Sequence, residues 1–231
     1  MSVWLVPAAA APAAADSRRP ARLAAGLIGL VWALGLLGHF TVVREWPALV
    51  VYVLGSIALT LWYCRRYDAW AAIGLTRRNL RAALLWGGLI GGALMLLDMG
   101  NTFIYYRNGG VPLAEMERIL VGMRMAYLFP LLVLAEEWLW RGMLFAGLLA
   151  RGVNRHVVVI VTTLLYMANH YAVAPVGMAE RGLMAVMALP IGLVGGYLVL
   201  RTRNTWASVA LHTLTMISML ADVFILPALA R

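Results

Sequence analysis

The stretch MAYLFPLLVLAEEWLWRGMLFAGLLA, residues 125–150, decides the fold, because it is a long apolar run that contains three charged side chains. A helix of roughly 20 apolar residues is long enough to cross a bilayer. A charged side chain at the bilayer centre costs roughly 2.5–3.5 kcal/mol on insertion scales. The charges of Glu136, Glu137 and Arg141 therefore predict a polar cavity between membrane helices, pairing among themselves, or both.

The spacing of these charges predicts different roles for the two glutamates. Glu137 and Arg141 are four residues apart, so a helix places them on one face in the order that favours an ion pair. Glu136 is rotated from Glu137 by about 100° around the helix axis. We therefore expect Arg141 to neutralise Glu137 and to leave Glu136 available for chemistry.

The composition of the 231 residues excludes a soluble globular domain. Hydrophobic residues make up 63% of the chain, with a mean hydropathy of +0.84, whereas about 45–50% is usual in soluble domains. The net charge of +9 comes from 19 basic residues, all of them arginine, against 10 acids. Most arginines lie between apolar runs, where they indicate topology and lipid-headgroup contact. We expect the lipid bilayer as a partner, and no nucleic acid.

Seven apolar segments predict an all-α fold, a polytopic bundle of about seven transmembrane helices. The apolar runs are continuous rather than alternating, and only helices or closed barrels satisfy the backbone in lipid. Residues 1–21, rich in Ala and Pro, are expected to form a flexible N-terminal tail, and residues 22–231 a single domain. The predicted segments are 23–43, 47–64, 82–104, 119–150, 156–175, 182–200 and 205–226.

Two further patterns concern orientation and packing. Most arginines lie in the tail and in the second, fourth and sixth connections, so the positive-inside rule predicts a cytoplasmic N-terminus. We expect the protein to lie in the plasma (inner) membrane. In the third segment, Gly87/Gly91 and Gly88/Gly92 have the four-residue spacing that lets helices approach closely.

Two later segments contain histidines at depths compatible with that of Glu136. At about 1.5 Å per residue from the arginine-rich ends, Glu136 and His170 lie about 22 Å into the membrane and His212 about 13 Å. Alone, each histidine is explained by a hydrogen bond between helices. With an unpaired carboxylate they favour a functional site, because a carboxylate can take a proton from water while histidines orient that water or stabilise an oxyanion. Four polar residues near segment ends rank lower as functional candidates, namely His39, Asp98, His156 and Asp222.

These residues carry a resemblance to a known family. Glu136-Glu137 with Arg141 resembles the first motif of the CPBP intramembrane proteases, which comprise CAAX prenyl proteases of the Ras-converting enzyme type and bacteriocin-processing or immunity proteins. Residues 166–170, Tyr-Met-Ala-Asn-His, resemble the second motif, in which an aromatic residue, usually Phe, stands four before His. Residues 212–216, His-Thr-Leu-Thr-Met, resemble the third, in which Asn usually stands four after His. The motifs occur in the family's order, and the resemblance covers about residues 70–220.

The resemblance implies an intramembrane endopeptidase that needs no cofactor and hydrolyses a peptide bond near the C-terminus of a membrane-associated protein or peptide, lipidated in some relatives. In that reading Glu136 activates water, and His170 and His212 complete the catalytic site. Glu137 and Arg141 provide structural support.

Two departures from the family's pattern bear on the site. Tyr166 in place of Phe is a mild change. Met216 in place of Asn removes an amide that can position water or an oxyanion, because a thioether has no hydrogen to donate. Asn169 and Thr215 are the candidates to take over that role.

Three alternatives remain open at this point. Zinc would use Glu136, His170 and His212 as ligands, although the sequence lacks the His-Glu-x-x-His pattern. A non-catalytic scaffold or bacteriocin-immunity protein of the same fold is favoured by Met216. A proton-coupled transporter could use the same carboxylate and histidines, but no inverted repeat is evident.

Overall fold

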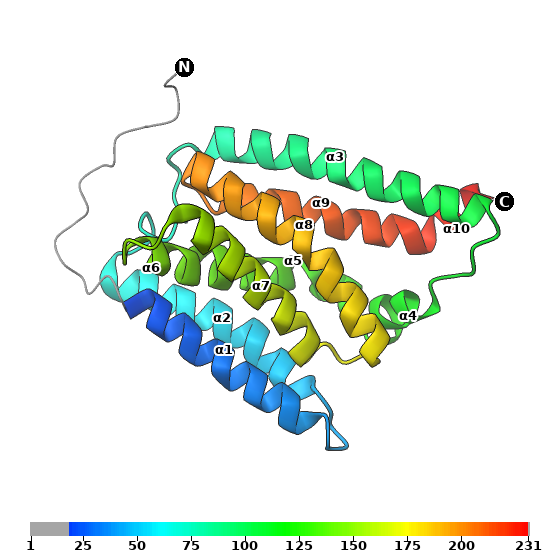
Figure 1. Ribbon diagram of the computed structural model, residues 1–231, viewed down its shortest axis with the longest axis horizontal. Coiled ribbons are helices and arrows are strands. Elements are labelled where there is room, and N and C mark those ends of the chain that lie inside the picture. The colour runs from blue at the N-terminus through cyan, green and yellow to red at the C-terminus, as the bar shows by residue number, and fades with distance from the viewer. Residues whose placement is uncertain (1–18, 231) are drawn as a thin grey trace.

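The computed structural model describes residues 19–230, and their regular structure is helical throughout (Figure 1). The predicted tail lies outside the described residues except for residues 19–21, which begin the first helix. The helices in chain order are α1 (Arg19–Gly38), α2 (Trp46–Tyr67), α3 (Leu80–Arg107), α4 (Ala114–Glu117), η1 (Arg118–Gly122), α5 (Met125–Glu137), η2 (Trp138–Leu144), α6 (Phe145–Leu149), α7 (Arg155–Val173), α8 (Met178–Thr202), α9 (Trp206–Phe224) and α10 (Leu226–Leu229).

The lengths and composition of these helices confirm an all-α membrane protein. Within residues 19–230, six helices, namely α1, α2, α3, α7, α8 and α9, are long and apolar enough to cross a bilayer. The bent pair of residues 114–122 and 125–149 provides a seventh span if it is counted as one. Large apolar side chains that face outward on these helices suit contact with lipid rather than with water. The prediction of a polytopic bundle of about seven helices is confirmed.

The fourth predicted segment, residues 119–150, is broken rather than continuous. The chain bends by 87° between residues 114–122 and residues 125–149. Arg124 at the bend has φ of +56°, in the left-handed region that ends a helix. α5 begins at Met125 and ends with Glu136 and Glu137, directly before the π-helical turn η2. Such a turn widens the helix and is frequent at functional sites.

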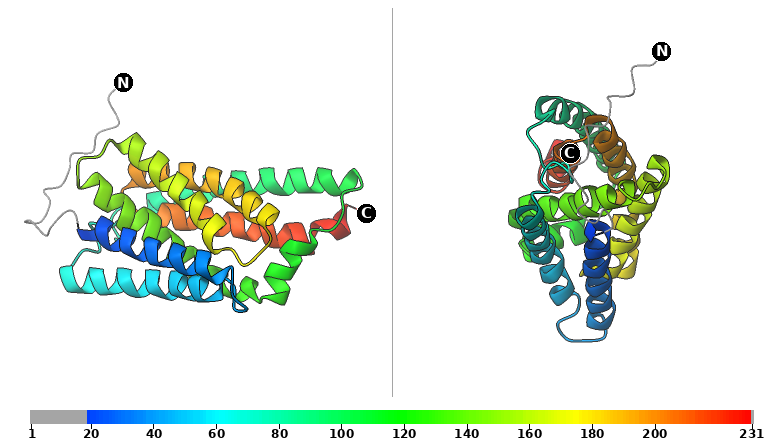
Figure 2. Two further views of the ribbon diagram at one scale, coloured as in Figure 1. Left: turned by 60° about the horizontal axis from the view of Figure 1, so that its bottom comes forward. Right: turned by 90° about the vertical axis from the view of Figure 1, so that its left-hand side faces the viewer.

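The helices pack as three long pairs around α5 and η2. α1 lies along α2, α3 along α9, and α7 along α8. α1 and α2 lie on the side of the bundle opposite α3, as both views of Figure 2 show. α5 contacts α2 and α9, and η2 contacts α1, α2, α7 and α8. The acidic pair therefore lies on the central element, within reach of side chains from several other helices.

The glycines of α3 set how closely it approaches α9. Gly87 and Gly91 face α9, and a Cβ at Gly91 would lie 2.8 Å from the Cα of Leu211. The predicted close approach is confirmed for this pair. It is wrong for Gly88 and Gly92, because a Cβ at either position would meet open space within 4 Å. The close approach holds α9 against α3 at the residue next to His212.

A buried ion pair joins the start of α8 to the α1–α2 connection. Arg181 in the first turn of α8 donates to Glu45, which stands just before α2, and both side chains are almost fully buried. Arg181 also donates to the carbonyl oxygens of Tyr171 and Val176, at 2.9 and 3.1 Å. The Nδ1 atom of His39 lies 2.9 Å from Glu45 Oε1. These contacts hold the α7–α8 connection, which forms part of the cavity described next.

Candidate active site

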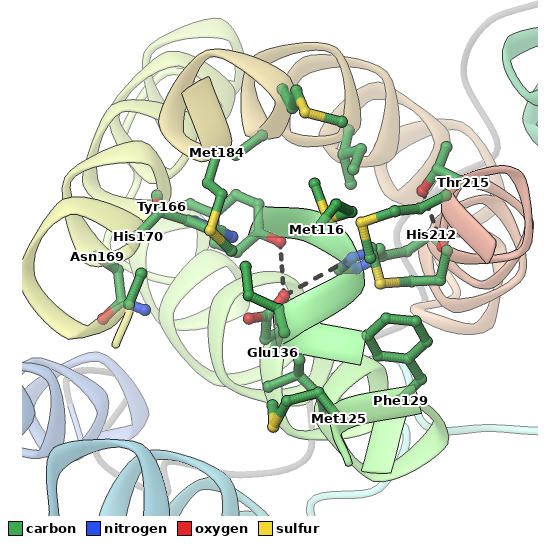
Figure 3. Close-up of a pocket in the computed structure, with 18 of the residues that line it drawn as sticks. Met116, Met125, Phe129, Glu136, Tyr166, Asn169, His170, Met184, His212 and Thr215 are labelled. Carbon is green, nitrogen blue, oxygen red and sulfur yellow. Dashed lines mark hydrogen bonds and ion pairs between the residues drawn. The ribbon is translucent and has the colours of Figure 1, made fainter. Parts of the chain in front are cut away.

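A cavity of about 320 Å³ opens between α2, α3, α5, α7, α8 and α9 (Figure 3). Its wall is mostly apolar and includes six methionines, whose flexible side chains adapt to irregular shapes. A few polar side chains interrupt the apolar surface, as in many ligand-binding pockets. They are Tyr52, Asp98, Asn101, Glu136, Tyr166, Asn169, His170, His212 and Thr215.

The structure brings the three candidate catalytic side chains to this one cavity. Glu136 comes from α5, His170 from α7 and His212 from α9. The Nε2 atom of His212 lies 3.7 Å from Glu136 Oε2, and the side chains of both residues are nearly buried. That distance is too long for a direct hydrogen bond. Three segments that are far apart in the sequence thus supply one acid and two bases to a shared space.

Glu136 is not the unpaired carboxylate that the sequence suggested. The hydroxyl of Tyr166 donates a hydrogen bond to Glu136 Oε2 at 2.6 Å, drawn as a dashed line in Figure 3. Tyr166 lies on α7, one helical turn before His170. The sequence analysis treated Tyr166 only as an aromatic substitute for Phe, because nothing in the spacing of motifs reveals where a hydroxyl will point.

Glu137 is fully buried and is held by three side chains. Arg141 Nη1 lies 3.5 Å from Glu137 Oε1, which confirms the predicted pair. His212 Nδ1 lies 2.8 Å from the same oxygen, and the hydroxyl of Ser208 donates to Glu137 Oε2. The sequence analysis missed both α9 contacts, although Ser208 stands four residues before His212 and so shares its helix face.

The guanidinium group of Arg141 has an aromatic neighbour besides its carboxylate. Its central carbon lies 4.4 Å from the ring centroid of Tyr166, within the range of a cation–π contact. Among the described residues, Nη1 and Nη2 of Arg141 have no hydrogen-bond partner. The charge of Arg141 is therefore balanced by Glu137 and by the face of the Tyr166 ring.

The hydrogen-bond partners of the two histidines determine which nitrogen carries the hydrogen. His170 Nδ1 lies 2.9 Å from the backbone carbonyl oxygen of Tyr166, and that oxygen can only accept. His212 Nδ1 faces the ionised carboxylate of Glu137, which likewise accepts. Both histidines therefore hold a hydrogen on Nδ1 and keep Nε2 for water or a substrate.

The candidates for positioning water or an oxyanion also line the cavity. Asn169 accepts a hydrogen bond from Trp32 Nε1 through Oδ1 at 3.0 Å, which orients its amide and leaves the NH₂ group as a donor. Thr215 donates its hydroxyl to the carbonyl oxygen of His212 at 2.8 Å. Met216 lies in the wall beside it. Thr215 must therefore release the His212 carbonyl before it can serve a substrate.

The four lower-ranked polar residues divide between the cavity and other places. Asp98 lines the cavity, and Ser218 donates to its Oδ2 atom at 2.7 Å. His39 belongs to the buried Glu45 pair, and His156 lies 3.1 Å from the hydroxyl of Tyr197 in an exposed position. Asp222 is buried on α9 outside the cavity lining, and its backbone carbonyl accepts a hydrogen bond from Tyr106. The low ranking of Asp98 overlooked its place in the wall, because a position near a segment end says nothing about which face of the helix it occupies.

The zinc alternative can be compared with the arrangement of donor groups. Within residues 19–230, no three side chains of His, Cys, Asp or Glu are placed to hold a metal ion together. A catalytic zinc site usually takes three protein ligands. The arrangement does not fit such a site, and we derive no catalytic step through a metal.

Comparison with known proteins identifies the segment that carries the site. Residues 119–217 match the family model described as type II CAAX prenyl endopeptidase, Rce1-like. This part of the chain is similar to that family. The Rce1-like segment contains all three motifs, and the predicted resemblance is confirmed over this range. The match suggests CAAX-type intramembrane protease activity, and the six or seven apolar helices of the described residues suit an integral membrane protein. No curated protein and no solved structure matched the chain.

Proposed function

We propose that the chain is an intramembrane endopeptidase that cleaves a peptide bond near the C-terminus of a membrane-associated protein or peptide. One observation carries this proposal: Glu136, His170 and His212, supplied by three separate helices, line a single cavity among apolar helices. Intramembrane ionisable groups are costly and are usually retained for function. Three of them in one cavity match the needs of peptide hydrolysis, which requires a base and groups that stabilise charge.

Glu136 is the residue that we assign to water activation. Its carboxylate takes a proton from a water molecule while the water oxygen bonds to the carbonyl carbon of the scissile peptide. The π electrons of the carbonyl move to its oxygen and form the oxyanion. When the C–N bond breaks, Glu136 returns the proton to the leaving amine nitrogen, so the carboxylate is regenerated.

The histidines act on either side of this carboxylate. His212 Nε2 lies 3.7 Å from Glu136 Oε2, so a water molecule bound to Glu136 is within reach of that nitrogen. His170 keeps its Nε2 for the same space, because its Nδ1 is bound to the backbone. We assign orientation of the water to the neutral form of these two residues, in which Nε2 accepts a hydrogen bond from the water. We assign stabilisation of the oxyanion to the doubly protonated form, in which Nε2 donates. Asn169 and Thr215 are further donors for either purpose.

Glu137 and Arg141 are assigned structural support. Glu137 has no exposed surface, and its oxygens already interact with Arg141, Ser208 and His212, so it is not placed to meet a substrate. Its contacts join η2 to α9 and hold His212 in place. The division of labour between the adjacent glutamates thus follows from burial as well as from spacing.

The apolar wall bears on the kind of substrate. A cavity with many methionines accepts an apolar peptide segment or an attached lipid chain, and it offers little to a strongly polar peptide. A membrane-associated substrate also reaches the cavity without leaving the bilayer. The substrate proposal therefore covers lipidated and unmodified C-terminal segments.

The test compares membranes that carry the wild-type protein with membranes that carry Glu136→Gln. The variant keeps the shape of the side chain but cannot act as a base, so we expect proteolysis to be abolished while expression and helix content persist. Proteomic analysis of membrane proteins should reveal a C-terminus that is cleaved only with the wild type. Glu115→Gln, an exposed glutamate paired with Arg118, is the matched control and should retain cleavage. Near-full activity of Glu136→Gln would contradict the mechanism.

A scaffold or immunity protein of the same fold is the second candidate. Met216 in the cavity wall favours it, because the related enzymes usually have an Asn there and a thioether cannot donate a hydrogen bond. The test is whether any membrane peptide is hydrolysed by the wild-type protein.

We also propose a plasma (inner) membrane location with a cytoplasmic N-terminus. The orientation is supported by the distribution of arginines among the connections, which follows the positive-inside rule. Reporter fusions at residue 1 and within the residue 108–113 connection test this orientation. A reporter at the N-terminus that is active only outside the cytoplasm would reverse it.

A further inference from the structure

The hydroxyl of Tyr166 makes a contact with the candidate base that the proposed mechanism does not use. Tyr166 is fully buried, and its hydroxyl donates to Glu136 Oε2 at 2.6 Å (Figure 3). A hydrogen bond from a hydroxyl to an ionised acceptor is short and roughly twice as strong as a neutral one. The bond is therefore strong enough to determine how the carboxylate is turned.

The ring of Tyr166 is held in place independently of that bond. Arg141 lies against its face at 4.4 Å from the ring centroid, and the imidazole of His170 meets it edge-on with centroids 4.6 Å apart. The indole of Trp140 packs at 5.9 Å. A ring fixed by three neighbours presents its hydroxyl at one position. The donor is thus preorganised before any substrate arrives.

The carboxylate of Glu136 needs such a restraint because its side chain is long and flexible. The other polar group beside it, His212 Nε2, does not hydrogen-bond to it. Glutamate loses considerable rotamer freedom when it is fixed in one orientation. His212 Nε2, at 3.7 Å, is beyond hydrogen-bond distance from Glu136, and Arg141 pairs with Glu137 instead. Among the described residues, the Tyr166 hydroxyl is the group that donates a hydrogen bond to this carboxylate.

We propose that Tyr166 is a positioning residue: its hydroxyl holds Oε2 of Glu136, so that Oε1 is turned to take the proton of the attacking water. This inference rests on the proposed function. Tyr166 keeps its own proton throughout. The water proton moves to Glu136 and then to the leaving amine, and no bond to Tyr166 forms or breaks.

Tyr166→Phe removes one oxygen atom and keeps the ring with its three neighbours. We expect kcat to fall by about tenfold or more, because a misplaced base loses much of its effect, while KM changes by less than about twofold. Tyr106→Phe is the matched control. Its hydroxyl donates to the backbone carbonyl of Asp222 at 3.1 Å and lies outside the cavity lining, so kcat should be unchanged.

A variant that folds poorly would obscure this comparison, and a second replacement removes that problem. 4-Fluorophenylalanine at position 166 fills the space of the hydroxyl with an atom that cannot donate a hydrogen bond. We expect the same loss of kcat with thermal unfolding close to that of the wild type. A normal kcat with either replacement would overturn the positioning role.

A double-mutant cycle tests whether Tyr166 acts through Glu136. Glu136→Asp shortens the side chain by one methylene, so its carboxylate no longer reaches the hydroxyl. In that background we expect Tyr166→Phe to cost less than about threefold in kcat, since two residues that act as a unit are non-additive. If Tyr166→Phe again costs tenfold, Tyr166 acts independently of Glu136 and the inference is wrong.

The same variants separate failure of this inference from failure of the proposed function. Activity of Glu136→Gln at the wild-type level contradicts the proposed function as a whole. Loss of activity in Glu136→Gln with full kcat in Tyr166→Phe contradicts only the role of Tyr166.

Discussion

The Nδ1 atom of His212 lies 2.8 Å from Oε1 of Glu137, so the histidine of the third motif is oriented by the second glutamate of the first. The carboxylate can only accept, and it therefore fixes the hydrogen of the imidazole on Nδ1. The other nitrogen, Nε2, is left facing Glu136. Glu137 thus supports both the fold, through Arg141, and the orientation of a candidate catalytic group.

The Glu137–Arg141 pair should be energetically coupled. Glu137→Gln or Arg141→Leu alone leaves a buried charge without its partner, which costs roughly 3–5 kcal/mol of stability. The double variant should recover part of that loss, because neither charge is then left alone. Unfolding of detergent-solubilised protein, followed by circular dichroism, measures all four members of the cycle. If the two single losses simply add, the pair is not coupled and our division of roles between the glutamates is wrong.

Exhaustive chelation should leave proteolysis in place. The proposed mechanism uses side chains alone, so removal of metal removes no reacting group. Activity is measured after chelation, together with metal analysis of the purified protein. Loss of activity that stoichiometric zinc restores would instead make Glu136, His170 and His212 metal ligands.

Thr215→Val tests the hydroxyl next to the third motif. The replacement has nearly the same shape but no donor, so we expect lower kcat if Thr215 stabilises an oxyanion. A fixed donor of this kind is worth about 10²–10³ in kcat. The hydroxyl of Thr215 must first leave the carbonyl oxygen of His212, so we expect a smaller loss, on the order of tenfold. The kcat of the wild type and of Thr215→Val is compared by steady-state kinetics on a peptide that the wild type cleaves. An unchanged kcat would exclude Thr215 from this role.

Met216→Asn should raise turnover. The side chain at this position lies in the cavity wall, and an amide there adds a donor that the thioether lacks. In an active enzyme we expect the largest gain when Thr215→Val is also present, since the new donor then replaces a lost one. If the wild-type protein hydrolyses no membrane peptide and Met216→Asn gains hydrolysis, the scaffold interpretation is correct for the natural chain.

Because of the buried pair of Glu45 and Arg181, the folding stability of the protein should fall at acidic pH. Burial raises the pKa of Glu45, but hydrogen bonds from His39 and Arg181 outweigh that effect and hold its pKa below the ordinary value of 4.5. Its contribution to stability is therefore fully present above pH 4.5 and is lost as pH falls through the lower folded-state pKa.

Thermal unfolding between pH 6 and pH 3 measures this dependence. Glu45→Gln removes the titrating group, so the part of the acid sensitivity that belongs to the pair should disappear. Arg181→Met should be more destabilising than Glu45→Gln near neutral pH, because it leaves the Glu45 carboxylate buried and charged. Identical pH profiles for the wild type and Glu45→Gln would contradict this account.

The sequence by itself determined the class of fold and the local chemistry. Continuous apolar runs in lipid must be helical, because the backbone has no other way to satisfy its hydrogen bonds. The pair of Glu137 and Arg141 was also predictable, since residues four apart on one helix are neighbours whatever surrounds them. Both results depend only on the geometry of a single helix, which the spacing of residues along the sequence is enough to describe.

Only the tertiary structure decided which groups meet at Glu136. The Tyr166 hydroxyl and His212 come from other helices, 30 and 76 residues away along the chain, and their contacts depend on how each helix is rotated about its axis. The bend at Arg124 likewise depends on a left-handed backbone conformation that an arginine rarely adopts. Spacing along the chain fixes neither the rotation nor the separation of two helices. Those are set by close packing, as where Gly87 and Gly91 bring α3 against α9.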